Sequence, residues 1–518
     1  MNDHPPTSAG TIGRPVPPIP LAGTDSDPGE RLESTVVPIG PDARSDLAAA
    51  CPIHDVVIGP DGRAEASRDW WPLALHWALA GDVPRLAGVI ARPRTTAEVA
   101  ALMTACHRHR LPVTPAGGRS GVCGGTLTVH GGVLLDLTGL AGIVDIDVES
   151  GVVRVRAGTF GPDLEAALGE HHGLSVGHFP QSFDLATVGG WVACRGAGQY
   201  STRYGKIEDM VVGLEVVLAD GSVVTTGGHA AGAVGPDLDQ LFIGSEGTLG
   251  VITEVSLRTH PVAEFVATAA YRLPDLDAAF EACRRTIRAG ATPAVFRLYD
   301  PIESARSHGG DGVGCALLVL DEGHPALVGA TMDVVDEHVR SCGGGAADGD
   351  LVENWLRHRN DTGALQALTE RGFVVDTMEV TVAWSGLARV HEAVRSATSA
   401  VPGVVNVSAH LSHSYPDGAC LYFSFAARPD REDPERSGPD WVDRVHRQMW
   451  DAAQGAALAA GGNLSHHHGI GLNRARFMPA ALGDAFGVLV AVKEALDPLG
   501  ILNPGKLGLP DRLGPVRW

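Results

Sequence analysis

A net charge of −21 over 518 residues argues against nucleic acid or an anionic membrane surface as the main partner of this chain. Eight scattered cysteines without a CxxC pair suit free thiols in a reducing cytoplasm, and they argue against a disulfide framework or a zinc site. Because no apolar run approaches the roughly 18 residues of a membrane span and no signal-peptide pattern is present, we expect two or three globular domains, a cytoplasmic location and no integral membrane span.

Residues 1–85 are expected to lie outside the main domains. Residues 1–45 are rich in Pro, Gly, Ser and Thr and have too little apolar surface to fold alone, so a disordered or draped tail is expected. Residues 46–85 follow as a linking segment. Its adjacent Trp70 and Trp71 are expected to pack in a core or at a seam between domains.

The next segment predicts a strand, a helix and a second strand. After the strand at 89–90, residues 95–98 (TTAE) carry a capping-box pattern that predicts the start of a helix. One face of that helix is apolar at helical spacing: Val99, Leu102, Met103 and Cys106. Pro112 ends the helix, and a second strand from Val113 leads into a glycine loop at 117–125, GGRSGVCGG.

Strand signals continue to Pro261 and complete one domain, residues 86–261. Apolar and β-branched runs predict strands at 133–137, 151–157 and 252–258. Residues 211–226 predict a β-hairpin, because an Asp-Gly pair at 220–221 separates two such runs.

Residues 262–500 show a different pattern, in which strands and helices alternate without glycine loops. We expect a second domain there, which would bind substrate or act as a cap. The expected strands are 295–298, 316–320, 404–410 and 420–425. The expected helices are 275–289, 328–340, 390–400 and 441–460.

Two further glycine loops follow the first, at 177–205 and at 244–250 (GSEGTLG). Because glycine costs about 0.5–1 kcal/mol in a helix or strand interior, such loops suit a backbone that passes close to a flat or charged group. Three of them within about 130 residues indicate the cradle of one large phosphate-bearing cofactor, and three unrelated surface turns are the alternative. A Rossmann fold fits less well, because GGRSGVCGG is not GxGxxG and a strand-like run follows it.

All three loops, in this order and spacing, resemble the FAD-binding domain of the vanillyl-alcohol oxidase / p-cresol methylhydroxylase flavoprotein family. The resemblance implies an α+β fold, with a two-part FAD-binding domain of the p-cresol methylhydroxylase type followed by an α+β substrate (cap) domain. It also implies that residues 501–518, which begin with ILNPGK, return to the flavin. The implied FAD contacts are Pro115, Ala116, Gly117, Gly118, Arg119, Ser120, Gly121, Gln181, Ser182, Asp184, Thr187, Gly190, Cys194, Gly196, Ala197, Glu246, Gly247, Thr248, Gly250, Val251 and Ile252.

Two stretches outside the loops hold candidates for chemistry. His466, His467 and His468 precede a glycine turn, and histidine can move protons near neutral pH or bind a phosphate as a cation. A solvated polar loop or metal affinity is the alternative interpretation. Tyr422 lies on a predicted strand and can act as acid or base beside a flavin if its pKa is lowered, whereas a core tyrosine with one hydrogen-bonded hydroxyl is the alternative.

The runs YPDGACLYF (415–423) and GGNLSHHHGIG (461–471) resemble the alkylglycerone-phosphate synthase group of this family, as do TVGGW, YGKIEDMVV and GSEGTLGVITE. The likeness covers about residues 86–507 and is weaker between 305 and 375. It implies flavin N5-adduct chemistry on an acylated dihydroxyacetone phosphate, in which a long-chain alcohol replaces the acid. The implied catalytic residues are Tyr422 as the acid/base, with Arg297, His466, His467 and His468 holding or organising the reacting groups.

One position departs from that group. A substrate-site arginine of the group aligns with Leu365, and the nearby Arg357, Arg359 and Arg371 are out of register. Without that cation a phosphorylated substrate is placed in doubt. The departure favours an alternative function, an FAD-dependent oxidase or dehydrogenase of an alcohol or 2-hydroxy acid, including one of specialised metabolism. A flavin-binding structural protein is a third alternative, but it would leave Tyr422 and the three histidines without a purpose.

The resemblance also bears on metals and on covalent flavin. D-2-hydroxy-acid dehydrogenases have a metal site of two histidines and a glutamate. In this chain His410 matches the first histidine, whereas Tyr422 and His467 stand at the other two positions. Because one ligand of three is retained, no metal is expected. Relatives that anchor FAD covalently do so where this chain has Arg119 or near Leu185, so non-covalent FAD is expected. A small-molecule substrate is expected, and a homodimer stays open.

Overall fold

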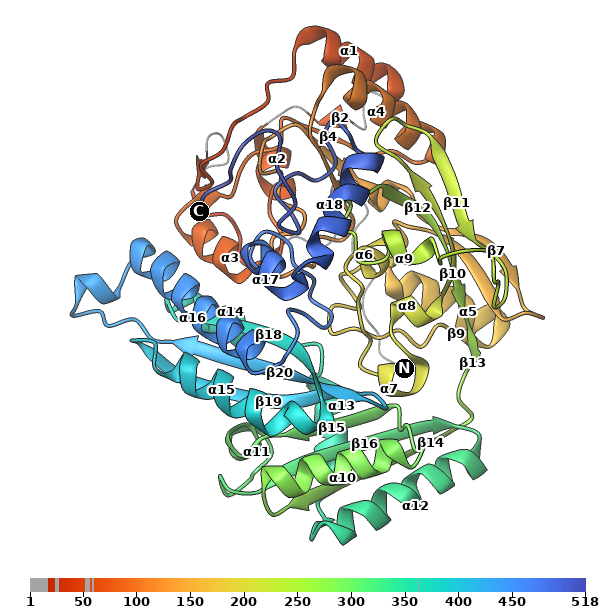
Figure 1. Ribbon diagram of the computed structural model, residues 1–518, viewed down its shortest axis with the longest axis vertical. Helices are drawn as coiled ribbons and strands as arrows, with labels where there is room; N and C mark the ends of the chain where they lie inside the picture. Colours follow the sequence, from red (N-terminus) through yellow and green to blue (C-terminus); the bar gives the residue numbers. More distant parts are fainter. Residues whose placement is uncertain (1–16, 24–27, 52–55, 58–59, 362) are drawn as a thin grey trace.

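The computed structural model describes residues 17–23, 28–51, 56–57, 60–361 and 363–518. An N-terminal half holds a four-stranded and a five-stranded sheet, and a C-terminal half holds a seven-stranded sheet (Figure 1). The end of the chain returns to the N-terminal half, where helices α17 (Met478–Leu482) and α18 (Ala485–Leu496) lie. The expected α+β organisation is confirmed. Within the described ranges, no helix is both long enough and apolar enough to cross a membrane.

The four-stranded sheet carries the first glycine loop at the end of one strand. Its order is β2 (Val56–Val57), β4 (Val89–Ala91), β6 (Val133–Asp136) and β5 (Val113–Ala116), and β4 and β5 both run parallel to β6. Helix α4 (Thr96–His109) joins β4 to β5, and Thr95 caps it by accepting a hydrogen bond from the Glu98 amide at 3.2 Å. The predicted strand, helix and strand are confirmed, and the apolar face of α4 is buried as expected.

The five-stranded sheet is antiparallel throughout. Its order is β11 (Val223–Gly227), β10 (Val211–Val217), β12 (Val251–Arg258), β8 (Val152–Arg156) and β7 (Ile143–Asp147). The predicted hairpin is confirmed, because Gly221 adopts a φ of +90° in the turn between β10 and β11. Glycine adopts that left-handed conformation at little steric cost.

The seven-stranded sheet forms the centre of the C-terminal half. Its order is β17 (Gly345–Ala346), β14 (Phe265–Leu273), β16 (Cys315–Gly323), β15 (Val295–Tyr299), β19 (Val404–Ser414), β20 (Gly418–Ala427) and β18 (Val374–Ala383). The helices that cover one face are α10 (Leu276–Arg288), α12 (Pro325–Ser341), α15 (Leu387–Ser399) and α16 (Pro439–Ala459) (Figure 1). These four helices and strands β15, β16, β19 and β20 confirm the predicted elements to within a few residues.

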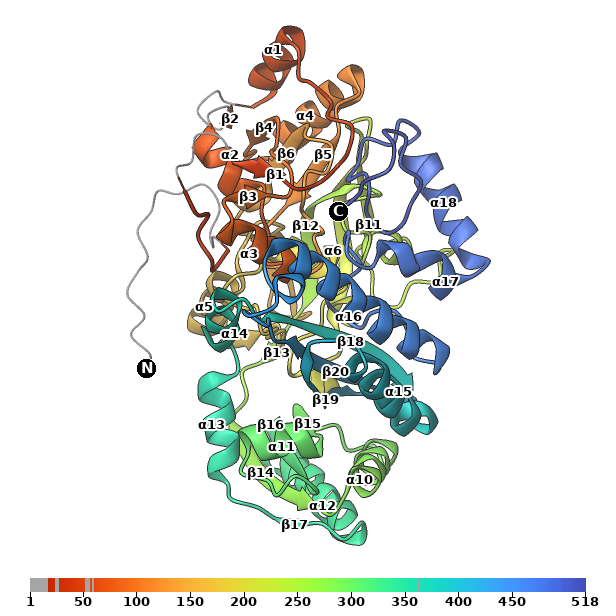
Figure 2. The same cartoon turned by 90° about the vertical axis from the view of Figure 1, so that its left-hand side faces the viewer.

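Alternation along the strands gives the seven-stranded sheet two different faces. On β20, Leu421 and Phe423 lie in the hydrophobic core under the helices, whereas Tyr422 and Ser424 line a cavity on the opposite face. This follows from the period-2 geometry of a strand, in which successive side chains point to opposite sides. Figure 2 shows α13 (Asp350–His358) and α14 (Gly363–Glu370) on the side of the sheet away from α10 and α15.

Several elements were not predicted from the sequence. Among the larger ones are β14, β18, α13 and α14. The remaining elements are β1 (Gly29–Glu30), α1 (Pro41–Ala50), α2 (Pro60–Ala66), α3 (Pro72–Leu79), β3 (Asp82–Val83), α5 (Gly161–His172), β9 (Leu174–Ser175), α6 (Val188–Ala193), α7 (Ser201–Tyr204), α8 (Ile207–Met210), α9 (Asp239–Phe242), β13 (His260–Pro261) and α11 (Pro301–Ser307).

Of the two expectations for residues 1–45, a disordered or a draped tail, the part that the structure describes is draped over the large domains. Ile19 and Leu32 are buried, and the Arg68 guanidinium donates to the Ile19 carbonyl at 2.9 Å. Helix α1, which begins at Pro41, packs on α4. Although the segment has little apolar surface of its own, its few apolar residues are buried against surface that the large domains supply. Residues 1–16 and 24–27 lie outside the described residues.

A cluster of aromatic rings joins the two halves. The Trp71 ring contacts the rings of Trp77, Trp518 and His446, with ring centroids 5.3, 5.0 and 5.9 Å apart. His446 belongs to α16 of the C-terminal half, and Trp518 ends the chain. The linking segment and the C-terminus therefore pack together on the C-terminal half, as a domain seam requires.

Candidate active site

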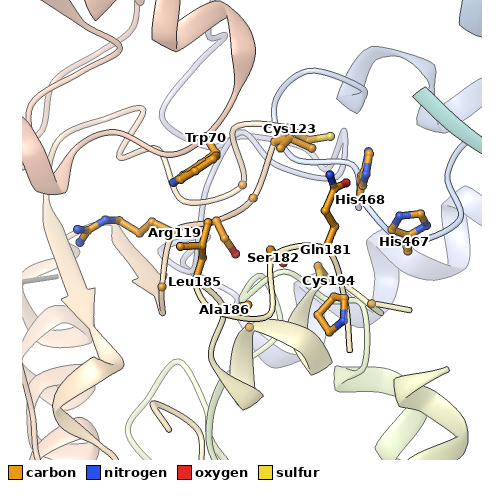
Figure 3. Close-up of a pocket in the computed structure, with 18 of the residues that line it drawn as sticks. Trp70, Arg119, Cys123, Gln181, Ser182, Leu185, Ala186, Cys194, His467 and His468 are labelled. Carbon is orange, nitrogen blue, oxygen red and sulfur yellow. The ribbon is translucent and has the colours of Figure 1, made fainter. Parts of the chain in front are cut away.

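A cavity of about 610 Å³ lies between the two halves (Figure 3). The three glycine loops form one side of it, and strands β15, β18, β19 and β20 of the seven-stranded sheet contribute the other side. The cavity is large enough for a cofactor and a small substrate.

The first and second glycine loops contact each other directly. A Cβ atom added to Gly117 would lie 2.2 Å from Thr187 Oγ1, and one added to Gly118 would lie 1.9 Å from the Leu185 carbonyl oxygen. Both positions therefore require glycine. Thr187 in turn caps α6 by accepting a hydrogen bond from the Gly190 amide at 3.3 Å, so the contact also places the start of that helix at the cavity.

Each loop region contains one non-glycine residue in the left-handed region of backbone space. These residues are Arg119, Arg195 and Glu246, with φ values of 54°, 57° and 50°. Such conformations cost free energy in L-residues and persist only where the surrounding structure holds them. Their occurrence beside one cavity supports a functional role for the three loops.

Arg119 is a buried cation whose guanidinium nitrogens have no hydrogen-bond partner in the described part of the chain. Burial lowers its pKa, and the neighbouring Asp136, Glu65 and Asp69 oppose that shift. Figure 3 shows its side chain extending away from Gln181 and His467, toward the opposite end of the cavity region. An unpaired buried guanidinium suits an anionic ligand such as a diphosphate.

Glu246 connects the third loop with the histidine segment and the C-terminus. Its carboxylate accepts hydrogen bonds from the backbone amides of Ile470 and Gly471 at 2.6 and 2.8 Å. Its carbonyl oxygen accepts from Asn503 Nδ2 at 2.7 Å, and the same amide group donates to the Gly125 carbonyl at 2.9 Å. The C-terminal segment therefore bridges the first and third loops at the cavity.

Most of the expected FAD contacts line this cavity. All those in the first and second loops do so, together with Glu246, Gly247, Gly250 and Ile252. Thr248 and Val251 do not line it. The Thr248 hydroxyl donates to the Ser245 carbonyl at 2.7 Å within its own turn, and Val251 packs in the core between the two sheets of the N-terminal half.

On the other side of the cavity, four adjacent strands place polar groups in one row. Glu379 on β18 lies opposite Tyr422 on β20, and Tyr422 lies opposite His410 on β19. His410 in turn lies opposite Tyr299 on β15. Directly opposed side chains on one face of a sheet contact each other. The row therefore brings the predicted Tyr422 together with Glu379, His410 and Tyr299, none of which was predicted as a catalytic residue.

Tyr422 stands at the centre of this row and lines the cavity. Its hydroxyl donates to Thr377 Oγ1 at 3.1 Å, and its ring stacks on the His410 ring at 4.7 Å with an interplanar angle of 12°. The rings of His467 and His468 lie 6.0 and 5.4 Å away. Burial raises the pKa of Tyr422 above its usual range, so the phenol is protonated at neutral pH.

Arg297 lines the same side of the cavity and is held by two partners. Its Nε donates to the Tyr299 hydroxyl at 2.8 Å, and its Nη2 lies 2.6 Å from His410 Nε2. Because a guanidinium can only donate, His410 must accept at Nε2 and carry its proton on Nδ1, which lies 3.2 Å from the Glu303 carboxylate. Burial and the adjacent Arg297 lower the pKa of His410, in agreement with this neutral form.

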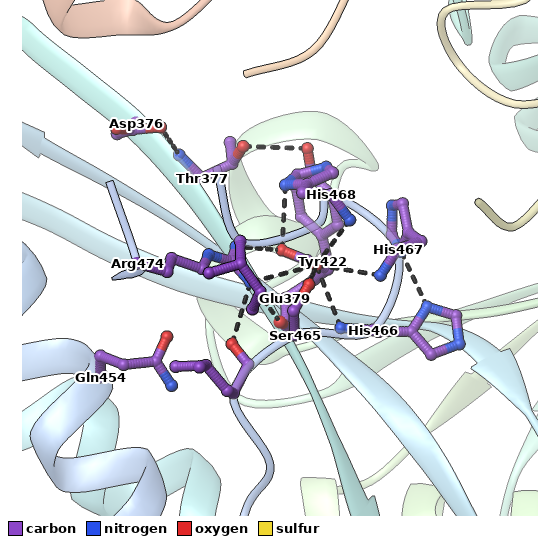
Figure 4. Close-up of polar contacts among 12 residues, drawn as sticks. Asp376, Thr377, Glu379, Tyr422, Gln454, Ser465, His466, His467, His468 and Arg474 are labelled. Carbon is purple, nitrogen blue, oxygen red and sulfur yellow. Dashed lines mark hydrogen bonds and ion pairs between the residues drawn. The ribbon is translucent and has the colours of Figure 1, made fainter. Parts of the chain in front are cut away.

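The histidine segment is folded around the buried carboxylate of Glu379 (Figure 4). One oxygen, Oε1, accepts from the backbone amides of His466, His467 and His468 at 3.1, 3.0 and 2.8 Å. The other oxygen binds Arg474, and His468 Nδ1 lies 2.9 Å from it. Although burial opposes ionisation, Arg474 and His468 hold the pKa of Glu379 well below its usual range.

The three histidines point in different directions from this turn. His467 and His468 line the cavity, whereas His466 does not. His466 stacks on the His413 ring at 4.7 Å and its Nε2 lies 2.7 Å from the Tyr415 hydroxyl. The sequence indicated neither Glu379 nor His413, because a single acidic or histidine residue within a strand carries no motif.

Leu365, which the resemblance aligns with a substrate-site arginine, also lies at the cavity. Helix α14 contributes Leu365, Gln366 and Thr369 to its wall. Arg359 does not line the cavity, because its guanidinium packs over the rings of Tyr200 and Trp355 at 5.3 and 5.6 Å. No cation of this helix therefore replaces the arginine expected from the resemblance.

Comparison with known proteins gives the family. An FAD binding domain model matches residues 87–227, and a model of the C-terminal domain of FAD linked oxidases matches residues 262–507. An FAD-linked oxidoreductase of Escherichia coli (strain K12), YgcU, named as uncharacterized, is 33% identical over 430 residues that cover 80% of this chain and 87% of that protein. The chain belongs to the FAD-linked oxidase family.

Other relatives carry different activities in their names. Alkyldihydroxyacetonephosphate synthase of Dictyostelium discoideum is 28% identical over 469 residues, which cover 82% of this chain and 74% of the synthase. Glycolate oxidase subunit GlcD of Bacillus subtilis (strain 168) is 29% identical over 430 residues, which cover 80% and 87%. The solved structure of p-cresol methylhydroxylase matches with a TM-score of 0.71 at 16% identity, over 93% of this chain and 100% of that one. The expected p-cresol methylhydroxylase type of fold is thereby confirmed.

Like other FAD-linked oxidases, this chain is an FAD-binding enzyme, and its cavity fits the cofactor. The first two loops pack so closely that they need glycine, and Arg119 supplies a buried cation without a partner among the described residues. Two thiols line the same cavity, and burial raises the pKa of Cys194 to about 12 and that of Cys123 well above its ordinary value. Such thiols are poor nucleophiles at neutral pH.

Proposed function

We propose that this flavoenzyme oxidises the hydroxyl group of a small alcohol or 2-hydroxy acid. The observation that carries the proposal is the uncharged wall that helix α14 presents at the cavity through Leu365, Gln366 and Thr369. Among the described cavity-lining residues, the arginines are Arg119 beside the glycine loops and Arg297 on the sheet side. One guanidinium on the sheet side can match the single charge of a carboxylate, whereas a phosphate monoester carries a charge of about −1.5 to −2 at neutral pH.

Arg297 is the group proposed to bind the acid end of the substrate. Its Nε and Nη2 are used by Tyr299 and His410, and Nη1 has no hydrogen-bond partner among the described residues. Tyr299 and His410 hold this guanidinium in place at the cavity wall, and Glu303 in turn binds His410. The similarity to a glycolate oxidase subunit supports the proposal, since glycolate is a 2-hydroxy acid.

Tyr422 and His467 are proposed to handle the hydroxyl proton. The Tyr422 phenol is protonated, and by turning its hydroxyl away from Thr377 it can donate a hydrogen bond to the substrate oxygen. Burial lowers the pKa of His467 well below its usual range, so its imidazole is neutral and can accept the proton. Bound FAD would supply the acceptor for the electron pair.

A second candidate function is the group exchange carried out by alkyldihydroxyacetonephosphate synthases. The observation that favours it is the position of Tyr422 between His410 and His467 on the cavity wall, because the resemblance makes this tyrosine the acid/base of such an enzyme. In that case Arg297 and His468 would bind the phosphate in place of the absent arginine.

Anaerobic mixing separates the two functions. We expect the flavin absorbance to bleach when the FAD-loaded enzyme meets glycolate, D-lactate or a primary alcohol, because hydride transfer reduces the flavin. A matched sample with acyl-dihydroxyacetone phosphate and a fatty alcohol should show no exchanged product. An exchanged product with the flavin left oxidised would reject the oxidoreductase in favour of the synthase reaction.

A further inference from the structure

A chain of short hydrogen bonds leads from the cavity toward the surface of the C-terminal half. His467 lines the cavity, and its Nδ1 lies 2.7 Å from His466 Nδ1 (Figure 4). His466 Nε2 lies 2.7 Å from the Tyr415 hydroxyl. Tyr415 is half-buried, and the next residues, Pro416 and Asp417, form an exposed turn. Three consecutive groups therefore lead from the cavity to a partly exposed tyrosine that directly precedes an exposed turn.

Contacts on every side fix the middle of this chain. The His466 amide donates to Glu379 Oε1 at 3.1 Å, and its carbonyl oxygen accepts from Lys206 Nζ at 2.9 Å. Its ring stacks on His413, whose Nδ1 lies 2.7 Å from Ser201 Oγ. The same Ser201 oxygen lies 3.4 Å from the Tyr415 hydroxyl. Proton transfer along a chain needs donors and acceptors held at hydrogen-bond distance, and these contacts supply that order.

The spacing of the two imidazoles restricts their protons. Two Nδ1 atoms that lie 2.7 Å apart cannot both carry a proton, so one of them donates to the other. If His467 carries its proton on Nδ1, its Nε2 has no proton and can accept one. His467 lines the cavity. His466 then accepts at Nδ1 and donates from Nε2 to Tyr415, which gives every link one donor and one acceptor.

We propose that His467, His466 and Tyr415 form a proton relay that carries the substrate hydroxyl proton from the cavity to solvent, a proposal that rests on the oxidation proposed above. The substrate O–H bond breaks as His467 Nε2 takes the proton, and His467 passes its Nδ1 proton to His466. His466 releases its Nε2 proton to Tyr415, and Tyr415 gives its own hydroxyl proton to water. The hydrogen of the substrate C–H bond would leave with its electron pair, as hydride, to bound FAD. His466 and Tyr415 are positioning residues of this relay, since neither lines the cavity.

The same cluster allows a competing interpretation as a metal centre. Ligand atoms of His413, His466 and His467 lie within 4.8 Å of one another, which is a spacing that a three-histidine metal site can use. However, both ring nitrogens of His466 already have partners at 2.7 Å, and the Lys206 ammonium group is bound to the same residue. A bound cation would have to replace the bond between the two histidines, so the geometry favours the relay.

The relay can be tested without a known substrate. In FAD-loaded enzyme with nitrogen-15 labelled histidine, we expect a downfield imidazole proton that is shared between two histidines. Tyr415→Phe removes one end of the chain and should shift this signal, whereas the control Tyr271→Phe should not. Tyr271 lies on β14 in the core under the helices of the same sheet. The relay is excluded if no shared proton is found, or if elemental analysis finds one tightly bound metal ion that His466→Ala removes.

A kinetic experiment tests the direction of proton flow. With glycolate or D-lactate as the probe, Tyr415→Phe should slow anaerobic flavin reduction at least about tenfold and retain FAD, as loss of a proton-transfer group does. Added imidazole should restore the rate, because a small proton carrier replaces the missing hydroxyl. A slowed variant that imidazole does not rescue would assign Tyr415 a merely structural role. If neither probe reduces the wild-type flavin, the proposed oxidation fails, and the shared-proton experiment still decides the relay.

Discussion

At the scale of single residues, Glu379 organises the sheet side of the cavity although it does not line it. Its carboxylate accepts three successive backbone amides and binds Arg474, so it fixes the turn that presents His467 and His468. Arg474 is fully buried, and its guanidinium lies 5.0 Å over the Trp450 ring. Removal of one charge from such a pair leaves the other buried and uncompensated.

We therefore expect Glu379→Gln to lower the free energy of unfolding by about 3–5 kcal/mol, the usual cost of breaking a buried ion pair. Chemical denaturation of the variant and of the exposed control Glu370→Gln measures the difference. The double variant with Arg474→Met should recover part of the loss, because it removes the unpaired cation as well. A stability equal to wild type in the single variant would contradict the assigned role.

Tyr422 is expected to matter for turnover and not for folding. Tyr422→Phe removes only the hydroxyl, which donates to Thr377, so the ring contacts with His410 and His467 remain. We expect normal FAD content and a rate lower by about 10²–10⁴-fold, the usual contribution of an acid/base group. Flavin content and steady-state rate are measured together. A rate within about threefold of wild type would make Tyr422 a packing residue.

Asp69 beside the first glycine loop predicts a pH-dependent stability. Burial raises its pKa to about 6, although the Trp71 amide and Thr126 donate to it. Because the folded state holds this proton more tightly than the unfolded state, the contribution of Asp69 to stability is fully present below about pH 4 and is lost as pH rises through about 6. The full difference is about 3 kcal/mol. The free energy of unfolding of Asp69→Asn, measured relative to wild type, should therefore rise between about pH 4 and pH 6 and stay constant above that range. Denaturation of both proteins at several pH values measures this difference.

At the scale of elements, local sequence patterns predicted some parts of the fold and the candidate site and missed others. Glycine loops, the capped helix α4 and the hairpin were predictable because turn and cap residues impose their own geometry. Strand β18 was not predicted, and its Glu379 has no partner nearby in the sequence, since Arg474 lies 95 residues away. Likewise, the two halves share an aromatic seam that depends on Trp518, which no local pattern assigns to Trp71. Such long-range pairs are fixed only by the packed fold.

Helix α14 gives a test of substrate charge. Leu365 lies on the face that lines the cavity, whereas the exposed Ala367 does not line it. Leu365→Arg should place a second cation at the substrate end and improve kcat/KM for a phosphorylated substrate relative to a neutral alcohol by about tenfold, the value of one charge-assisted hydrogen bond. Ala367→Arg adds the same charge outside the cavity and should leave the ratio unchanged. Equal ratios in both variants would remove α14 from the substrate site.

At the scale of the whole molecule, the cavity lies where both halves and both ends of the chain meet. Residues of the linking segment, including Trp70, line it together with strands of the C-terminal half. Asn503 near the C-terminus bridges the first and third glycine loops. A cofactor in this position contacts parts of the chain that are far apart in sequence, so its binding stabilises the arrangement of the halves as well as the loops.

This arrangement predicts a dissociable FAD whose binding raises the melting temperature of the whole protein. By the resemblance, the covalent flavin anchors of relatives fall on Arg119 and near Leu185, where this chain has no histidine or cysteine. The buried thiols Cys123 and Cys194 have raised pKa values. Acid precipitation should therefore release FAD into the supernatant. Apoprotein given FAD at 100 times its dissociation constant should gain about 2.7 kcal/mol of stability by mass action. Calorimetry should show one transition that shifts upward, because both halves contact the cofactor. Flavin that stays with the precipitate would contradict non-covalent binding, and two transitions of which only one shifts would show that FAD stabilises one half alone.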